Sequence, residues 1–397
     1  TVALYGTLTA GASDISLSNG SGTGSATAYG QLTGTNGLLL NPSQGTAFTL
    51  TLANTANAAN NYSGNTTISA NTTLALGAAN QIANGAGKGN LIINSGTFNM
   101  AGFSETINGL SGNGTIDGNG ATLNVGDNNA TSTFSGVIKN TAGTLALTKI
   151  GNGTLSLSGV NTYSGGTTVN AGTLSINVGS GISGALVMNN GTTVLGNAHN
   201  ALNALTSITM NGSTLSTTSN GYLLRSFNGA LTMVDSTIIG NPGDFAAASY
   251  TLSGNNTISG PTITQGSGNF NVTSGTTTIS SVLAYNLAGP TNGSLQKSGA
   301  GMLILSGNNT SSANVTISAG AGQTRAIGRQ VAVANSAKTL QAIQGAIAKM
   351  KSPTALAELA SVAKALGANT PDAKPQAFII SSIAGGSGAG MFMDVAE

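Results

Sequence analysis

Two stretches of the chain decide the fold: residues 147–172 read LTKIGNGTLSLSGVNTYSGGTTVNAG, and residues 295–320 read LQKSGAGMLILSGNNTSSANVTISAG. The offset between them is constant, and the shared positions hold a lysine, glycines and two dipeptides: Lys149 and Lys297, Gly151 and Gly299, Gly153 and Gly301, Ser158-Gly159 and Ser306-Gly307, and Ala171-Gly172 and Ala319-Gly320. A third, partial copy begins at Asn61, where NYSGNTTI matches the TYSGGTTV that begins at Thr162. Such internal repetition predicts a fold of stacked units.

Short apolar runs fill the stretches between the copies, and each is bounded by a turn with Gly or Asn. Residues 154–158 alternate apolar and polar side chains, whereas residues 91–93 are continuously apolar. Both patterns predict strands, and Gly and Asn tolerate the positive φ that sharp corners require. Because few connections are long enough for crossover helices, a doubly wound α/β fold is disfavoured. An antiparallel sandwich or barrel and a parallel solenoid remain.

Three features favour the parallel solenoid. The segment is too long for one sandwich, aromatic residues are only 4% of the chain, and Thr, Asn and Ser recur at matched places where they can stack between turns. If a turn takes about 20 residues, residues 1–320 make about 15 turns, and strands ~4.8 Å apart give a rod of ~70 Å.

The phrase LTKxGxGTLxLSGxNTYSGGTTVxAGTL, given by residues 147–174, resembles the autotransporter-associated β-strand repeat of bacterial autotransporter passenger domains and related surface proteins. The copies at 61–74 and 295–320 match in part, since Ser311 replaces the Tyr and Ala313-Asn314 replaces Gly-Gly. The resemblance implies an all-β fold, a right-handed parallel β-helix (β-solenoid) over about 1–320. It also implies secretion and exposure at the cell surface, and it implies no particular activity.

Composition and charge limit the partners. Charged residues are 6% of the chain, against about 25% in an ordinary domain, but apolar residues are 39% and argue against disorder. The net charge is +2, and residues 1–320 hold only five basic residues, so we expect no nucleic-acid partner: Lys88, Lys139, Lys149, Arg225 and Lys297. No apolar stretch approaches the ~20 residues of a membrane helix. The start at Thr1, without Met or a visible signal peptide, fits a processed or excised segment.

Composition changes after Gly322, and residues 321–397 form a second, small α/β-like segment with apolar residues at helical spacing. An apolar strand at 377–383 runs into a Gly-rich loop and a helix start, an arrangement that can cradle phosphate: Gly385, Gly386, Ser387, Gly388 and Gly390. The pattern GQTRAIGR…FIISSIAGGSGAGMFMDVA resembles bacterial tubulin-like GTPases, in which a GGTGSG-type loop holds nucleotide phosphates. Ser387 and Ala389 depart from that loop, and the similarity is confined to 322–397. We therefore predict an incomplete version of that fold and no cofactor.

Candidate catalytic residues are sparse. Residues 1–320 contain six acids and one histidine: Asp14, Glu105, Asp117, Asp127, Asp235, Asp244 and His199. A lyase or hydrolase on a β-helix needs paired carboxylates or a carboxylate-bound cation. Asp117 and Asp127 are half a turn apart and would face different sides, so we predict no catalytic residue and no metal site. Tyr62 and Tyr163 occupy equivalent repeat positions, where a structural role is favoured over sugar stacking.

The leading hypothesis is a secreted or cell-surface structural or adhesive protein, with self-assembly into filaments as its extension. We expect the chain to bind itself, a surface or a glycan. The alternatives are a carbohydrate-active enzyme on the same fold and an ice- or surface-binding protein. The enzyme needs a cleft with two or more acids, and the ice-binding protein needs Thr-x-Thr pairs in register on one flat face.

Overall fold

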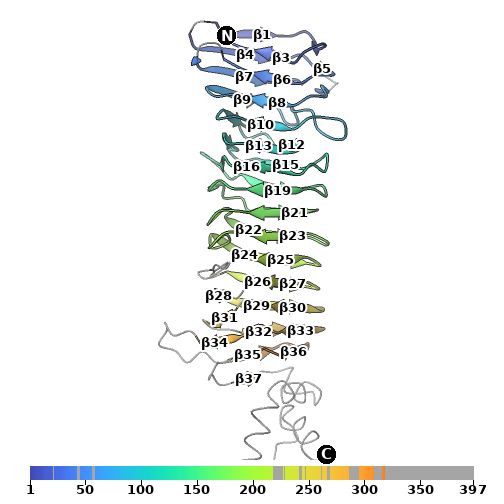
Figure 1. Cartoon of the computed structure of the whole chain (residues 1–397), viewed down its shortest axis with the longest axis vertical. Helices are drawn as coiled ribbons and strands as arrows, with labels where there is room; N and C mark the ends of the chain where they lie inside the picture. The colour runs from blue at the N-terminus through green and yellow to red at the C-terminus, as the bar shows by residue number, and fades with distance from the viewer. Residues whose placement is uncertain are drawn as a thin grey trace, which may run out of the picture.

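The computed structural model shows an elongated rod of parallel strands (Figure 1). It describes residues 1–317 apart from 21, 43–44, 56–58, 218–226, 228, 241–243, 246, 261, 266–268, 286–294 and 308–314. In this part of the chain there is no α-helix, and every strand pairing is parallel. The predicted all-β parallel solenoid is therefore confirmed. The α/β-like segment predicted for 321–397 lies outside the described residues.

One sheet, the long sheet, takes a strand from each turn and runs the whole length of the rod. Its strands are β3 (Ile15–Leu17), β6 (Leu38–Leu40), β8 (Thr66–Ile68), β10 (Leu91–Ile93), β13 (Leu110–Gly112), β16 (Ser132–Phe134), β19 (Thr154–Leu157), β21 (Thr173–Ile176), β23 (Thr193–Gly196), β25 (Thr214–Thr217), β27 (Thr237–Gly240), β30 (Asn256–Ser259), β33 (Thr276–Ile279) and β36 (Met302–Leu305). Fourteen strands ~4.8 Å apart give this face a length of ~60 Å.

A second face belongs to the N-terminal sheet, which ends halfway along the rod. Its strands are β1 (Val2–Leu4), β4 (Gly24–Ala28), β7 (Phe48–Leu52), β9 (Thr72–Leu76), β11 (Thr97–Asn99), β14 (Thr115–Asp117) and β17 (Val137–Lys139). Farther along, a three-stranded sheet takes the same place in the turn, between the long sheet and the third face. Its strands are β28 (Asp244–Phe245), β31 (Thr262–Gln265) and β34 (Leu283–Tyr285).

The third face begins as a pair, β2 (Leu8–Ala10) and β5 (Leu32–Gly34), and resumes lower down as the C-terminal sheet. The strands of that sheet are β12 (Glu105–Ile107), β15 (Thr122–Val125), β18 (Ala146–Lys149), β20 (Thr167–Val169), β22 (Gly184–Met188), β24 (Leu205–Asn211), β26 (Ala230–Val234), β29 (Ser249–Ser253), β32 (Asn269–Val272), β35 (Leu295–Ser298) and β37 (Val315–Ile317). Between β5 and β12 none of the described residues adds a strand to the third face, and the loops 53–65 and 77–90 take its place.

The number of residues in a turn is the sequence interval between two residues that pair in register on neighbouring strands. Five threonines pair in succession along the long sheet: Thr154, Thr173, Thr193, Thr214 and Thr237. The interval between neighbours in this series stays close to the predicted turn of about 20 residues. It is longer where Leu38 pairs with Thr66 and where Thr276 pairs with Met302.

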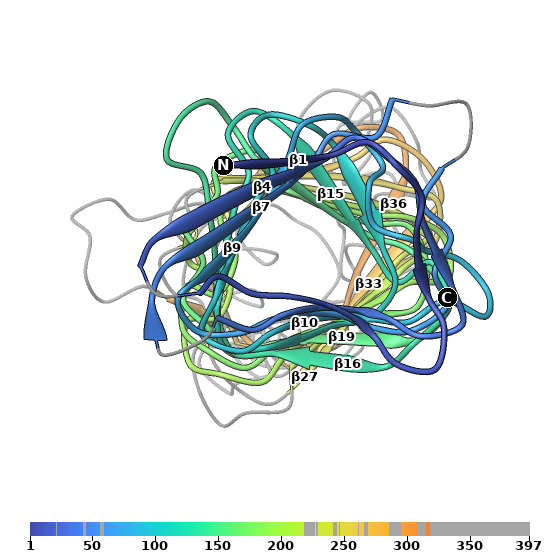
Figure 2. The same ribbon diagram turned by 90° about the horizontal axis from the view of Figure 1, so that it is seen from above.

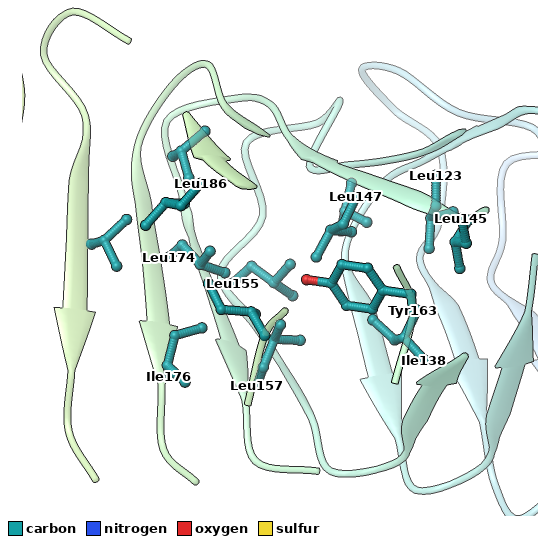
Figure 3. Packing of buried hydrophobic residues seen from close by; sticks show 14 of the residues in the cluster. Leu123, Ile138, Leu145, Leu147, Leu155, Leu157, Tyr163, Leu174, Ile176 and Leu186 are labelled. Carbon is teal, nitrogen blue, oxygen red and sulfur yellow. The ribbon is translucent and has the colours of Figure 1, made fainter. Parts of the chain in front are cut away.

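The strands of successive turns surround a central axis, as the view from above shows (Figure 2). The buried hydrophobic side chains make up the core of the rod. Side chains alternate along each strand, so every second residue points inward and stacks on its equivalent in the next turn. Leu155 and Leu157 of β19 lie beside Leu174 and Ile176 of β21 (Figure 3), and all four are buried. Each fully buried aliphatic side chain contributes about 1.5–3 kcal/mol relative to exposure, which makes these columns the main source of stability.

Candidate functional site

The lysine of the repeat is buried in both full copies. Lys149 is 1% exposed, and its Nζ donates to the carbonyl oxygens of Ile150 at 2.6 Å, Gly151 at 2.7 Å and Ala171 at 3.2 Å. Lys297, also buried, donates to Ser298 and Gly299 in the same way. Burial lowers the pKa of Lys149 to about 8, although the carbonyl partners favour its ammonium form. The lysine therefore has a structural role, because its ammonium group binds backbone carbonyls at the corners of the solenoid.

The asparagine two residues before the repeat tyrosine joins three successive turns. Asn161 Oδ1 accepts from the N–H of Ile138 in β17 at 2.8 Å, and its Nδ2 donates to the carbonyl of Gly181 at 2.7 Å. Asn60 makes the same two bonds, with the N–H of Leu32 in β5 at 2.8 Å and the carbonyl of Gln81 at 2.7 Å. In each copy the side-chain amide of the asparagine takes the place of the backbone of a further strand and continues the hydrogen bonds of the sheet.

This position coincides with the end of a sheet in both copies. β17 is the last strand of the N-terminal sheet, and β5 is the last strand of the short pair on the third face. In each last strand, one N–H points along the rod toward the next turn, which has no strand there to accept it. Buried without an acceptor, this N–H would cost about 1–3 kcal/mol. The repeat asparagine thus satisfies the final rung of a sheet.

Tyr62 and Tyr163 are both fully buried, and the hydroxyl of each bonds the threonine four positions on. The Tyr163 hydroxyl lies 2.6 Å from Thr167 Oγ1, and the Tyr62 hydroxyl lies 2.5 Å from Thr66 Oγ1. Figure 3 shows the Tyr163 ring among Ile138, Leu147 and Leu155. Burial raises the pKa of Tyr62 to about 12 and that of Tyr163 further. Both rings fill the core, as the structural interpretation predicted, and neither offers a face to a sugar.

Glu105 ends a buried polar ladder across the gap in the third face. Its carboxylate accepts from the backbone N–H of Gln81 at 2.7 Å and of Ile82 at 3.3 Å. The side chain of Gln81 in turn bonds the N–H and carbonyl of Asn54. Burial raises the pKa of Glu105 to about 8, while the backbone donors lower it. This acid therefore holds loop 77–90 in place and does not face solvent.

Three further carboxylates also bind neighbouring turns. Asp14 accepts from Gly37 N–H at 2.7 Å, Asp117 from Thr141 N–H at 2.9 Å, and Asp235 from Asn255 N–H at 2.7 Å. Asp117 also pairs with Lys139 at 3.3 Å. Desolvation raises the pKa of Asp117, but its hydrogen bonds to Thr141 and this lysine outweigh that effect and keep the pKa below the usual value. These bonds are what isolated turn carboxylates make.

The remaining candidates do not assemble into a site. Asp127 follows β15 of the C-terminal sheet, whereas Asp117 ends β14 of the N-terminal sheet, so the two lie on different faces as expected. His199 is exposed in the turn before β24. In the described part of the chain no three His, Cys, Asp or Glu side chains gather as metal ligands would. The side chain of Asp244 and the phosphate-loop candidate at 385–390 lie outside the described residues, and the loop stays a prediction.

The outward faces carry neutral hydroxyls in columns. Seven threonines follow one another in register on the long sheet: Thr154, Thr173, Thr193, Thr214, Thr237, Thr257 and Thr278. A second column on the C-terminal sheet contains Thr148, Thr168, Thr209, Thr232 and Thr251, with Val187 between the second and third. None of the described strands of the long sheet contains a charged residue. The sequence analysis predicted that hydroxyl and amide side chains stack between turns, but it did not identify which threonines share a column, because their spacing changes from turn to turn.

An exposed aromatic pair was also missed. Tyr5 and Tyr29 are 75% and 43% exposed, and their rings stack with centroids 5.0 Å apart and planes 9° from parallel. The signal was a Tyr-Gly dipeptide that occurs twice near the N-terminal end, at Tyr5-Gly6 and Tyr29-Gly30. The interval between the two copies is one turn of the rod, so the two rings meet.

Comparisons with known proteins agree with the resemblances. Residues 147–176 match the family model described as passenger-associated-transport-repeat, and residues 306–397 match the one described as tubulin like. The chain is 33% identical over 226 residues to the adhesin BmaC autotransporter of Brucella suis biovar 1 (strain 1330). That match covers 50% of this chain and 6% of the adhesin. No solved structure matches.

The described residues include no helix that is long and apolar enough to cross a membrane. The solenoid, the repeat model and the adhesin similarity together confirm the resemblance to autotransporter passenger repeats. The chain thus carries an autotransporter passenger repeat within a parallel β-solenoid and a tubulin-like stretch after it.

Proposed function

We propose that the solenoid is an adhesive rod, secreted or displayed at the bacterial surface, and that its outward faces make the contacts. The observation that supports this most strongly is the division between inside and outside. Lys149 and Asn161 of the repeat are buried in bonds between turns and Tyr163 fills the core, whereas the outward face of the long sheet is left as a neutral column of hydroxyls. The similarity to a protein named as an adhesin supports the same function.

Adhesion is tested with the full chain coupled to fluorescent beads. We expect these beads to attach to cultured animal cells or to abiotic surfaces more than beads coated with a heat-unfolded sample. Equal attachment of the two bead types would contradict an adhesive function.

Self-association into filaments is the finer part of this proposal. Its support is the low charge of the rod, because uncharged flanks repel one another weakly. Negative-stain electron microscopy should show end-to-end or side-by-side rods at micromolar concentration. Particles that stay monodisperse at every concentration would remove filaments while leaving adhesion intact.

Binding to a crystalline surface such as ice is a second candidate. The seven-threonine column of the long sheet favours it, because strands ~4.8 Å apart place the hydroxyls at regular intervals on one face. A gap between the freezing and melting points of a protein solution would support it. A solution that freezes like one of bovine serum albumin at the same concentration would count against it.

The hydrogen bonds of the carboxylates support a non-enzymatic role over the carbohydrate-active alternative. Asp14, Glu105 and Asp235 each accept a backbone N–H from a neighbouring turn, so they serve the fold. A reducing-end assay on a panel of polysaccharides should stay at background. Release that is lost in Asp117→Asn would revive the enzyme hypothesis.

A further inference from the structure

The stacked tyrosines belong to a column that continues along the rod. Tyr29 N–H donates to Leu4 at 2.8 Å, Ala53 N–H to Ala28 at 2.9 Å, and Gly77 N–H to Leu52 at 2.7 Å. These bonds extend the ladder of β1, β4, β7 and β9 by one residue. Tyr5, Tyr29, Ala53 and Gly77 therefore follow one another at one corner of four successive turns.

The stack runs along the axis of the rod. The centroid separation of 5.0 Å is close to the ~4.8 Å between neighbouring strands, so each ring lies over the next turn. One face of Tyr29 meets Tyr5, and its other face is directed toward Ala53. The 43% exposure of Tyr29 is consistent with a face that the alanine methyl leaves uncovered.

Small residues form a floor below that ring. Ala53 has only a methyl, and Gly77 has no side chain. A Cβ at Gly77 would lie 2.7 Å from the Ala53 Cβ, so a larger residue could not be added without a shift. The floor extends over two strand spacings, ~10 Å, which leaves room for a flat ring to pack against the free face of Tyr29.

Polar groups border the floor. The neighbouring outward column of the N-terminal sheet contains Thr27, Thr51, Ala75 and Asn99 in register. The next two positions of this column are Asp117 and Lys139, which neutralise each other at 3.3 Å. An aromatic face, a small floor, hydroxyls and an amide thus lie on one surface with no excess charge.

We propose that Tyr5, Tyr29, Thr51, Ala53 and Gly77, called here the tyrosine shelf, bind a neutral oligosaccharide, one ring of which packs against the free face of Tyr29 while the chain runs across the rod. This inference rests on the proposed adhesive function and names the chemical class of its partner. A pyranose ring has an apolar C–H face, which packs on an aromatic face, and a rim of hydroxyls, which bond Thr and Asn side chains. Nucleobases also stack on tyrosine, but single-stranded nucleic acid needs a basic groove, and the lysine bordering this surface is already paired with an acid.

The test is isothermal titration of the full chain with three tetrasaccharides: cellotetraose, N,N′,N″,N‴-tetraacetylchitotetraose and the acidic tetragalacturonate. We expect saturable binding of at least one neutral probe and none of the acidic one. Tyr29→Ala should weaken the binding about tenfold, because the stacking face is lost. Ala53→Leu, which occupies the floor, should weaken it similarly.

Two controls accompany these variants. Tyr29→Phe keeps the ring and should stay within about threefold of the parent, and Ile239→Ala removes an exposed side chain of the long sheet and should change nothing. Resistance to proteolysis shows that each variant is folded. The shelf is overturned if no neutral probe binds, or if Tyr29→Ala binds as tightly as the parent.

The shelf and the adhesive function fail in different ways. Bead attachment that persists in Tyr29→Ala overturns the shelf as the adhesive site and leaves adhesion standing. Absence of attachment by the parent chain overturns adhesion, whereas saturable sugar binding that depends on Tyr29 still supports the shelf.

Discussion

Tyr163 and Tyr29 show how the same residue type serves two different regions of the rod. Tyr163, in the repeat copy at 147–172, is fully buried and bonded to Thr167, whereas Tyr29, near the N-terminal end, is 43% exposed and stacked on Tyr5. The copy with the recognisable signature therefore stabilises the rod, and the surface without a signature is available to partners. The residues that define a repeat motif in a solenoid can therefore be those that stabilise the stacking of turns, without any role in binding.

The acid that bridges the gap in the third face gives the largest expected effect, through pH. The folded-state pKa of Glu105, about 8, lies above its ordinary value of 4.5. Its contribution to the free energy of unfolding is therefore complete below about pH 4.5 and lost as pH rises through 8, by up to about 5 kcal/mol. Denaturant midpoints between pH 4 and 9 should fall, and Glu105→Gln should flatten the fall. A parent profile that rises over this range would contradict the buried environment.

Truncation of the buried tyrosine should cost nearly as much. Tyr163→Ala removes a fully buried ring, and such changes cost about 3–5 kcal/mol because they leave a cavity. The matched surface variant, Tyr5→Ala, should change stability by less than about 0.5 kcal/mol. Thermal melts of the two variants, side by side, measure the contrast. Equal melting temperatures would break the division between inside and outside.

Removal of the sheet-ending amide should have an intermediate effect. Asn161→Ala leaves the N–H of Ile138 and the carbonyl of Gly181 without their partner, at a cost of about 2–4 kcal/mol. Hydrogen exchange should show the Ile138 amide losing protection, while amides of β23 keep theirs. An unchanged Ile138 amide would mean that Asn161 does not complete the ladder.

Substitution on the hydroxyl face should be the mildest change. Thr214 lies in the middle of the threonine column of the long sheet. Because surface substitutions away from special features have small effects, Thr214→Ala should change the free energy of unfolding by only about 0.5 kcal/mol or less. The same variant tests the surface-binding candidate, since it interrupts the column without touching the core. Its denaturant midpoint is compared with that of Asn161→Ala, and an equally large loss would place this threonine among the residues that stabilise the fold.

The sequence was sufficient to predict stacking, because residues 147–172 and 295–320 align without gaps and a constant offset requires equivalent turns. It also favoured a structural role for Tyr62 and Tyr163. The burial of Lys149 could not be foreseen, because lysine is almost never buried unless paired, and its partners are carbonyls of its own turn and the next.

The changes of sheet along the rod were also beyond sequence reasoning. Loops 53–65 and 77–90 look like ordinary turn-rich stretches, and only the register shows that they replace a strand of the third face. Columns of side chains on the surface are likewise visible only once the register of the strands is known. Tyr5 and Tyr29 meet because the interval between them matches the length of their own turn, and a turn of another length would have separated them.

The central claim is that the repeat's signature residues serve the fold and the outward faces serve adhesion. Bead attachment per folded molecule, compared between Tyr163→Phe and Tyr29→Ala, tests it most directly. The account predicts full attachment by Tyr163→Phe, because the lost hydroxyl bonds Thr167 inside the core, and reduced attachment by Tyr29→Ala. Reduced attachment by folded Tyr163→Phe, with full attachment by Tyr29→Ala, would contradict it.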